Sequence, residues 1–251
     1  MKINRIQEME AFINEKHSVS NEDLCKMFSV SMQTLRRDLK ILEDQGRIHK
    51  VYGGVISNNF RLQSTVPTLM DRSGIHTSEK EYIGQLAAKL VDDNDIIFID
   101  SGTTVVHMLA HLKKKKNVTI ITHALNVMEQ AKTLSNVRFI SLGGEYNPLT
   151  NTFQFSASNY HYQVSKAFIA TVAISLEDGL RNMDYKEGAI KNLVMKSAES
   201  VFVLCDSSKF SARAFNFFST IHPICAVVSD EKVKQETIQR FQENDINIIT
   251  K

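Results

Sequence analysis

The polar side chains between residues 31 and 40 have the types and the spacing needed to contact duplex DNA. An Arg side chain donates two hydrogen bonds to guanine, a Gln amide pairs in a similar way with adenine, and Arg or Lys neutralises phosphate. At about 100° per residue, four such side chains share one face of a predicted helix: Gln33, Arg36, Arg37 and Lys40. The alternative is a surface helix on which these side chains only contact water, so the neighbouring elements must decide between the two.

A leucine stripe lies opposite this polar face. Leu35, Leu39 and Leu42 fall within about 60° of one another and need apolar partners. Two earlier segments supply such partners at helical spacing, namely Ile6, Met9 and Ile13 in the first and Leu24 and Phe28 in the second. The pattern therefore predicts three helices around a small core.

Short polar residues mark the ends of the second and third helices. Ser20 with Asp23 resembles a capping box, and Ser31 is a good N-cap for the third helix. Residues 29–30 are expected to form the turn between the two helices, and Gly46 stands where a C-terminal cap is expected. These signals predict two short capped helices joined by a tight turn.

A short β-ribbon is predicted after Gly46. Residues 47–56 alternate and contain a Gly-Gly pair, which indicates a hairpin on which Lys50 and Tyr52 contact a phosphate backbone, or else a solvated edge hairpin. Two helices, a tight turn and a ribbon are the layout of a winged helix-turn-helix, whose second helix enters the major groove. This context favours DNA contact over a merely solvated helix. The predicted DNA-binding residues are Ser31, Gln33, Thr34, Arg36, Arg37, Lys40, Lys50 and Tyr52.

The distribution of charge indicates a nucleic-acid partner, although the total does not. The 251 residues carry a net charge of +2, and residues 1–60 hold nine Lys or Arg against eight Asp or Glu. The acids fall mostly on the first two helices, whereas the third helix and the ribbon are locally basic. The three cysteines lack metal-ligand spacing, which predicts free thiols in a reducing cytoplasm. The sequence shows no signal peptide and no long apolar run, so we expect no membrane contact.

The remainder of the chain predicts a larger α/β domain. Residues 58–77 lose periodicity and gain Pro, Gly and small polar residues, which indicates a linker between domains at 1–57 and 78–251. Residues 78–81 are expected to cap a helix. The predicted buried face of that helix is Ile83, Leu86, Ala87 and Leu90. The predicted strands are 96–100, 118–122, 137–142, 167–173, 201–205, 224–229 and 246–249, and the further helices are 105–112, 124–135, 185–200 and 232–244. This alternation predicts a largely parallel sheet covered on both faces.

A polar loop follows the first predicted strand of that sheet. Asp100 ends the strand, and Ser101-Gly102-Thr103-Thr104 lead into the next helix. Ligands of open α/β sheets bind beyond the carboxyl ends of the strands, and backbone amides at a helix start attract anions. The loop is neither a Walker A motif nor GxGxxG. From the residues alone it is either an anion-binding loop or an ordinary turn.

Motifs in a fixed order run through almost the whole chain: Arg5-Ile6, Val19-Ser20, Asp23-Leu24, 28–31, 34–39, Leu42-Glu43, Gly46, 52–54, 99–104, 142–144 and 206–209. Together they resemble the DeoR family of bacterial transcriptional regulators. More narrowly, residues 5–10 and 179–191 resemble the inositol-catabolism repressors. The resemblance implies a winged helix-turn-helix joined to a mostly parallel α/β sensor domain that resembles ribose-5-phosphate isomerase.

The same resemblance implies a site for phosphorylated sugars or related intermediates. The residues it assigns to effector binding are Asp100, Ser101, Gly102, Thr103, Thr104, Gly143, Gly144, Asp206 and Lys209. Lys209 would supply a cation; the alternative is a solvated loop lysine. The chain departs from the family at His123, where Asn is usual, and at 156–158, where a glycine is usual. Both positions fall where the pocket is expected, so the identity of the effector stays open.

Two other pairs of polar residues are expected to be structural. Glu187 and Lys191 share a helix face at i,i+4 spacing and predict a surface ion pair. His107 and His111 are four residues apart on a helix, but no Glu of an HExxH motif lies between them and no third ligand is near in sequence. We expect helix surface or core packing there and no bound metal.

These patterns predict a metabolite-controlled transcription factor, a repressor of a sugar or polyol catabolic operon that acts without a cofactor. Its partners would be a double-stranded operator, a phosphorylated sugar and further copies of the chain on repeated half-sites. The alternative is a sugar-phosphate isomerase or ring-opening hydrolase with an appended DNA-binding head. Its base would be one of four carboxylates, none of which can be assigned: Asp100, Asp184, Glu187 and Asp206. A purely architectural DNA protein would leave the α/β domain without a task.

Overall fold

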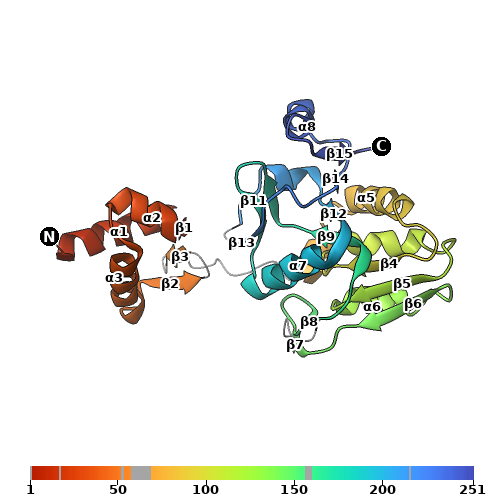
Figure 1. The fold of residues 1–251 in the computed structure, drawn as a ribbon, viewed down its shortest axis with the longest axis horizontal. Helices are drawn as coiled ribbons and strands as arrows, with labels where there is room; N and C mark the ends of the chain where they lie inside the picture. The colour runs from red at the N-terminus through yellow and green to blue at the C-terminus, as the bar shows by residue number, and fades with distance from the viewer. Residues whose placement is uncertain (1, 17, 52–53, 58–68, 156–159, 215) are drawn as a thin grey trace. The chain divides into compact units, whose positions relative to one another are not determined.

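The structure is a computed structural model that describes residues 2–16, 18–51, 54–57, 69–155, 160–214 and 216–251. The chain divides into two compact units, residues 1–66 and 67–251. This division falls inside the segment predicted as a linker (Figure 1).

The first unit consists of helices packed on a small antiparallel sheet. Its elements are α1 (Lys2–Lys16), β1 (Ser18–Ser20), α2 (Asn21–Phe28), α3 (Met32–Asp44), β2 (Ile48–Val51) and β3 (Gly54–Ser57), with the strands in the order β1-β3-β2. The leucines of α3 are buried with Met9 and Ile13 of α1. The predicted helices and hairpin are confirmed, and β1 is an addition because three residues are too few to show an alternating pattern.

Local signals fix the ends of α2 and α3 as predicted. The Ser20 and Ser31 hydroxyls each accept a hydrogen bond from the backbone N–H three residues later, at 3.0 and 3.3 Å. Gly46 follows α3 with φ +66°, in the left-handed region that favours glycine. The caps satisfy backbone groups at the ends of the two helices, whereas the leucine stripe determines which face of α3 packs on the core.

The second unit is built on a parallel sheet whose order is β15-β14-β12-β9-β4-β5-β6 (Figure 1). The strands are β4 (Ile96–Ile99), β5 (Val118–Thr122), β6 (Val137–Ser141), β9 (Val164–Ala170), β12 (Ala198–Leu204), β14 (Ala226–Val228) and β15 (Asn247–Ile249). All neighbouring pairs are parallel, so the carboxyl ends of the strands lie along one edge. Each of the seven predicted strands is present in this sheet, which confirms the α/β fold class.

Helices cover both faces of this sheet. One apolar cluster contains residues of α5 (Thr77–Lys89), the 3₁₀ helix η1 (Val105–His111) and α6 (Leu125–Ala131). The other contains residues of α7 (Tyr185–Ser197) and α8 (Gln235–Gln242). The helix expected at 105–112 is a 3₁₀ helix over Val105–His111. The helix expected at 185–200 ends at Ser197, because β12 begins at Ala198.

Several elements were not expected from the sequence. The short helix α4 (Leu69–Ser73) lies in the predicted linker. Two small antiparallel sheets are formed by β7 (Glu145–Asn147) with β8 (Thr152–Gln154), and by β10 (Ala173–Ser175), β11 (Gly179–Asn182) and β13 (Asn216–Ser219). The 3₁₀ helix η3 (Ser207–Phe210) follows β12. These pieces are too short to show a periodic pattern.

The start of α5 also differs from the prediction. The helix begins at Thr77, after His76 in the left-handed region with φ 55°, and has no side-chain cap. The expectation that residues 78–81 cap it is wrong, because these residues lie inside the first turn. Lys80 is consequently buried in the unit, only 4% exposed, and does not lie on a solvated helix end.

Candidate DNA-binding surface and effector site

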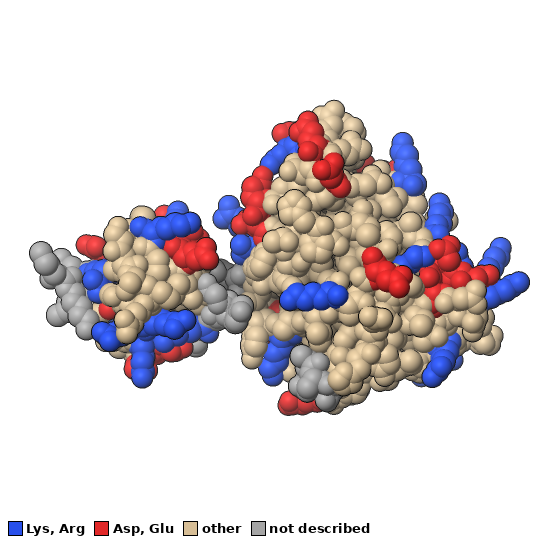
Figure 2. All heavy atoms as spheres, viewed as in Figure 1, with Lys and Arg blue, Asp and Glu red and all other residues tan. Residues whose placement is uncertain are grey.

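The polar face of α3 is exposed while its leucine face is buried. Leu35, Leu39 and Leu42 are at most 2% exposed. The exposed residues of the opposite face are Gln33, Arg36, Arg37 and Lys40. Figure 2 shows Lys and Arg side chains gathered at the end of this unit where Figure 1 draws α3. The side chains can therefore reach a DNA groove without any change in the core of the unit.

One acidic residue of α3 points inward. Asp38 is 1% exposed; its Oδ2 accepts a hydrogen bond from Arg5 Nε at 2.9 Å and lies 2.7 Å from Arg5 Nη2 in an ion pair. This ion pair connects α1 to α3 and so helps to orient the exposed polar face of α3. It was missed in the sequence, although Asp38 stands between Leu35 and Leu42 on the apolar face, where an acid requires a partner.

The other predicted DNA contacts have partners inside the unit. The Ser31 hydroxyl caps α3 and lies 3.1 Å from the Thr34 hydroxyl. The Lys50 ammonium forms an ion pair with Glu43 at 2.8 Å. Such partly exposed pairs contribute at most about 1 kcal/mol, so a phosphate can replace Glu43 at little cost. Tyr52 lies outside the described residues.

In the second unit, the predicted ligand loop begins in a buried ion pair. Asp100 follows β4 and is completely buried; its Oδ2 accepts hydrogen bonds from the Ala170 backbone N–H at 2.9 Å and from the Lys191 ammonium. Lys191 also donates to the Ala170 carbonyl at 2.8 Å. A Cβ added to Gly102 would lie 2.2 Å from the Cβ of Ala170. The loop therefore packs closely on β9, and Asp100 holds β4, β9 and α7 together.

Glu187 of α7 is the other acceptor at this edge of the sheet. Its Oε2 accepts a hydrogen bond from Ser101 Oγ at 2.8 Å and lies 3.4 Å from His123 Nε2, and its Oε1 accepts one from Thr152 at 2.6 Å. Burial raises the pKa of Glu187, but the hydrogen bond and charge of His123, the charge of Lys191 and the Thr152 hydroxyl outweigh this and lower its pKa to about 2. Glu187 is therefore an ionised acceptor that joins α7 to the loops after β4 and β5.

The expected surface ion pair between Glu187 and Lys191 is wrong. The two side chains are 2% and 3% exposed and contact different partners at the carboxyl ends of the strands. Asp184 caps α7 by accepting hydrogen bonds from two backbone N–H groups, at 2.8 and 3.0 Å. The i,i+4 spacing places both residues on one helix face, but that face turns toward the sheet.

His123 directly follows β5 and lies beside the carboxylates of Glu187 and Asp100. It is completely buried, stacks on Phe98 with ring centroids 5.7 Å apart, and meets Phe155 edge-on at 6.2 Å. Its Nδ1 has no hydrogen-bond partner among the described residues. The position where the chain departs from the family pattern is thus part of the cluster around Glu187.

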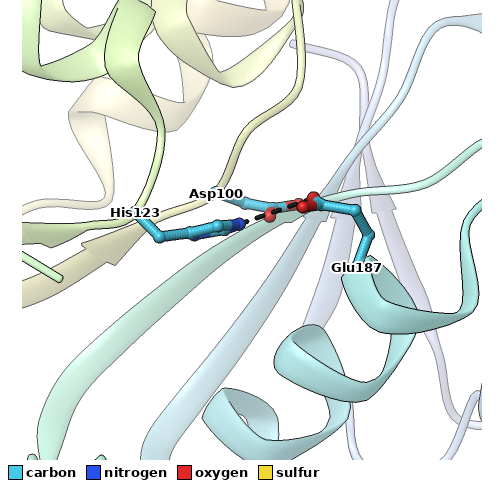
Figure 3. Close-up of side chains that lie close together, drawn as sticks. All are labelled: Asp100, His123 and Glu187. Carbon is cyan, nitrogen blue, oxygen red and sulfur yellow. Dashed lines mark hydrogen bonds and ion pairs between the residues drawn. The ribbon is translucent and has the colours of Figure 1, made fainter. Parts of the chain in front are cut away.

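Asp100, His123 and Glu187 converge as the ligands of a metal would (Figure 3). One ligand atom from each lies within 4.8 Å of the others. The oxygens are already occupied, however, by the Lys191 ammonium on Asp100 and by two hydroxyls on Glu187. An ammonium at this place repels a second cation, so the donor set fits a hydrogen-bonded network better than a metal centre.

The pair His107 and His111 faces a single carboxylate. His107 Nδ1 and His111 Nε2 lie 2.9 and 2.8 Å from the two oxygens of Glu81 on α5. We expected helix surface or core packing for these two residues, and both side chains are half-buried beside α5.

The remaining effector residues assigned by resemblance lie along the same sheet edge but not in the cluster around Glu187. Gly143 and Gly144 follow β6 and are exposed; a Cβ on Gly144 would lie 2.0 Å from the carbonyl oxygen of Gln154, so the close approach is to β8. Asp206 follows β12, is 2% exposed and caps η3, with Lys209 Nζ 3.8 Å from its Oδ2. Thr103 and Thr104 are buried in the loop after β4. In the sheet order, β9 lies between β12 and β4, so it separates the loop with Asp206 and Lys209 from the loop with Thr103 and Thr104.

Comparison with known proteins gives the family. The model of the DeoR-like helix-turn-helix domain matches residues 5–61, and the model of the DeoR C-terminal sensor domain matches residues 75–231. The chain belongs to the DeoR family. It is therefore a DNA-binding transcriptional regulator and not an enzyme, as predicted.

Relatives of this regulator match over nearly their full length. The HTH-type transcriptional regulator IolR of Bacillus subtilis is 36% identical over 99% of both chains. The lactose phosphotransferase system repressor of Staphylococcus epidermidis is 30% identical over 96% of this chain and 98% of its own. Ribose 5-phosphate isomerase from Plasmodium falciparum aligns with 20% identity and a TM-score of 0.41 over 53% of the regulator and 52% of its own chain. Among the described residues, no helix is long and apolar enough to cross a bilayer.

Proposed function

We propose that this regulator represses a sugar or polyol catabolic operon and releases its operator when a phosphorylated sugar, or a related metabolite, binds the second unit. The observation that carries the proposal is the combination, in one chain, of an exposed cationic helix face and a buried polar cluster at the carboxyl edge of a parallel sheet. That edge is where open α/β sheets bind ligands. The regulator would act in the cytoplasm.

The names of the relatives support the choice of operon. They include a lactose phosphotransferase system repressor and a putative aga operon transcriptional repressor. The narrower resemblance to inositol-catabolism repressors agrees with the 36% identity to IolR and adds polyols to the candidates.

The proposed site is the row of loops after β4, β6 and β12. In it, the Ser101-Gly102-Thr103-Thr104 loop and the Lys209 ammonium would contact the effector, and Glu187 with Lys191 would hold the loop in place. An effector that binds one arrangement of the unit better shifts the population toward that arrangement. We also propose a homo-oligomer, since paired recognition helices match repeated half-sites.

The test combines DNA binding with a ligand screen. Fluorescence anisotropy with the DNA upstream of the regulator's own gene gives the affinity, and ribose 5-phosphate, glucose 6-phosphate and fructose 1-phosphate are added in turn. The unphosphorylated sugars are the matched controls. We expect at least one phosphorylated compound to weaken DNA binding and raise the melting temperature, while its parent sugar does neither. Tight DNA binding that no phosphorylated sugar or polyol changes would contradict the proposal.

A further inference from the structure

The first turn of α3 presents an uncharged surface to solvent. The residues of this turn are Met32, Gln33, Thr34 and Leu35. Leu35 is completely buried in the core of the unit, and the hydroxyl of the half-buried Thr34 lies 3.1 Å from the Ser31 hydroxyl. Met32 and Gln33 are exposed. A partner that meets the start of α3 therefore contacts one amide side chain and one methionine.

Met32 is a large apolar side chain that the core of the unit does not use. It is 38% exposed, whereas Leu39, about 20° away around the helix axis, is 2% exposed. The apolar cluster of the unit includes Leu39 but, among the described residues, not Met32. Single exposed apolar side chains are common on protein surfaces, so the position of this one must indicate what it contacts.

The position of Met32 is one at which a helix-turn-helix meets the bases. In such a motif, the N-terminal residues of the second helix contact base edges in the major groove. Here α3 is that second helix, and Met32 is its first residue. At about 100° per residue, Met32 lies about 40° from Arg36, so both side chains point to the same side of α3. Met32 has no hydrogen-bond donor and only a weak acceptor, so the group that it matches in the groove is apolar.

The apolar group that base pairs expose in the major groove is the C5-methyl group of thymine. An unbranched, polarizable methionine side chain adapts its shape to such a group. We propose that Met32 contacts the methyl group of a thymine in the operator and is a specificity-determining residue of this regulator. The inference rests on the proposed function only in taking α3 as the helix that reads the operator, and no effector enters it.

The test replaces each thymine of the DNA upstream of the regulator's own gene by deoxyuridine in turn, which removes the methyl group and retains base pairing. Anisotropy without effector gives the affinities of wild type, Met32→Ala and the matched control Met27→Ala, which removes a 60% exposed methionine from α2. We expect wild type and Met27→Ala to lose about fourfold in affinity at one position of each half-site, the factor that burial of one methyl group contributes. Met32→Ala should bind the unmodified DNA more weakly and be insensitive to deoxyuridine at that position.

The outcomes separate this inference from the proposed function. If no replacement weakens wild type, or if Met32→Ala loses as much affinity as wild type at the sensitive position, the contact is wrong. In the second case another residue or the shape of the DNA reads the methyl group. Arg36→Ala judges α3 independently, because it should weaken binding to every duplex and retain the sensitivity to deoxyuridine. Wild-type affinity in Arg36→Ala would instead contradict the assignment of α3. Both methionines are exposed, so the variants should unfold as wild type does.

Discussion

The two units of this regulator treat charge in opposite ways. In the first unit, the cations of α3 face water, and one acid, Asp38, turns inward to a single partner. In the second unit, Asp100, Glu187 and Lys191 are at most 3% exposed. Their hydrogen bonds connect α7 to β9 and to the loop after β4. The first arrangement leaves charge available for a partner, whereas the second uses charge to hold the fold of a ligand-binding edge.

The physical consequence is a difference in what each charge contributes. An exposed cation adds little to folding, because water solvates it as well as any carboxylate does. A buried ion pair contributes little when both partners are present, but the loss of one partner leaves an uncompensated charge in the interior. Removing a buried cation should therefore destabilise the second unit, whereas removing an exposed cation of α3 should leave the first unit folded and weaken its binding to DNA.

The largest effect is expected for Lys191→Met. This substitution leaves Asp100 buried without its ammonium, and breaking a buried pair in this way costs about 3–5 kcal/mol of unfolding free energy. Hydrogen exchange on the full chain measures the effect, because the amides of β4 and β9 should exchange much faster while those of α3 keep their wild-type rates.

The matched control is Lys196→Met in the same helix. Lys196 is exposed in the last turn of α7, and its replacement should change stability by no more than about 0.5 kcal/mol. If the two variants are equally stable, the contrast between buried and exposed charge fails for this unit.

The next effect is the response of the second unit to acid. The pKa of Glu187 is lowered from 4.5 to about 2 in the folded chain, against the raising effect of burial, by His123, Lys191 and Thr152. The ionised form is therefore favoured in the folded state, so its contribution is complete above pH 4.5 and is lost as pH falls toward 2. A shift of this size corresponds to about 3 kcal/mol.

Urea unfolding followed between pH 6 and about 2 checks this linkage. Glu187→Gln removes the titrating group and should flatten the acid side of the stability profile, although the variant starts from a lower value. An unchanged acid slope in Glu187→Gln would show that other carboxylates control the acid response of the unit.

The sequence predicted the first unit more completely than the second, and the reason is the range of the interactions. The caps of α2 and α3 act over three residues, and the leucine stripe of α3 repeats within one helix, so a short window of sequence contains them. The ion pair between Arg5 and Asp38 spans 33 positions and was missed. Local order is visible in a single sequence, and long-range pairing is not.

The cluster at the sheet edge shows the same limit more strongly. Asp100 and Lys191 are 91 positions apart, and Ser101 and Glu187 are 86 apart. Periodicity predicted the strands and showed that Glu187 and Lys191 share one helix face. Whether that face turns to the sheet or to solvent depends on how α7 packs, which the spacing does not show. The fold class and the loop at Asp100 could be predicted, whereas the inward direction of α7 could not.

A smaller effect, on binding and not on folding, is expected for Arg36→Ala. The side chain is exposed on the polar face of α3, and if it contacts a base as proposed, losing that bidentate contact costs about 1–3 kcal/mol, or roughly tenfold to a hundredfold in operator affinity. Unfolding of the full chain and its response to phosphorylated sugars should stay as in wild type.

Arg138→Ala is the control, since Arg138 is an exposed arginine on β6 of the second unit. Anisotropy titrations with operator DNA at several salt concentrations separate base contacts from phosphate contacts. Equal operator affinity for the two variants would break the assignment of the α3 face.

The smallest effect is expected for Ser31→Ala, and it tests whether this residue serves the fold or the DNA. The Ser31 hydroxyl accepts the Thr34 N–H at 3.3 Å, and removing an N-cap costs about 1 kcal/mol, which should appear as faster exchange of the first-turn amides of α3. Ser31→Thr retains the hydroxyl and should retain the cap. If Ser31→Ala lowers operator affinity as much as Arg36→Ala at a temperature where both are folded, Ser31 contacts DNA directly. If it lowers stability alone, the cap acts through the position of α3, and the exposed cations supply the affinity.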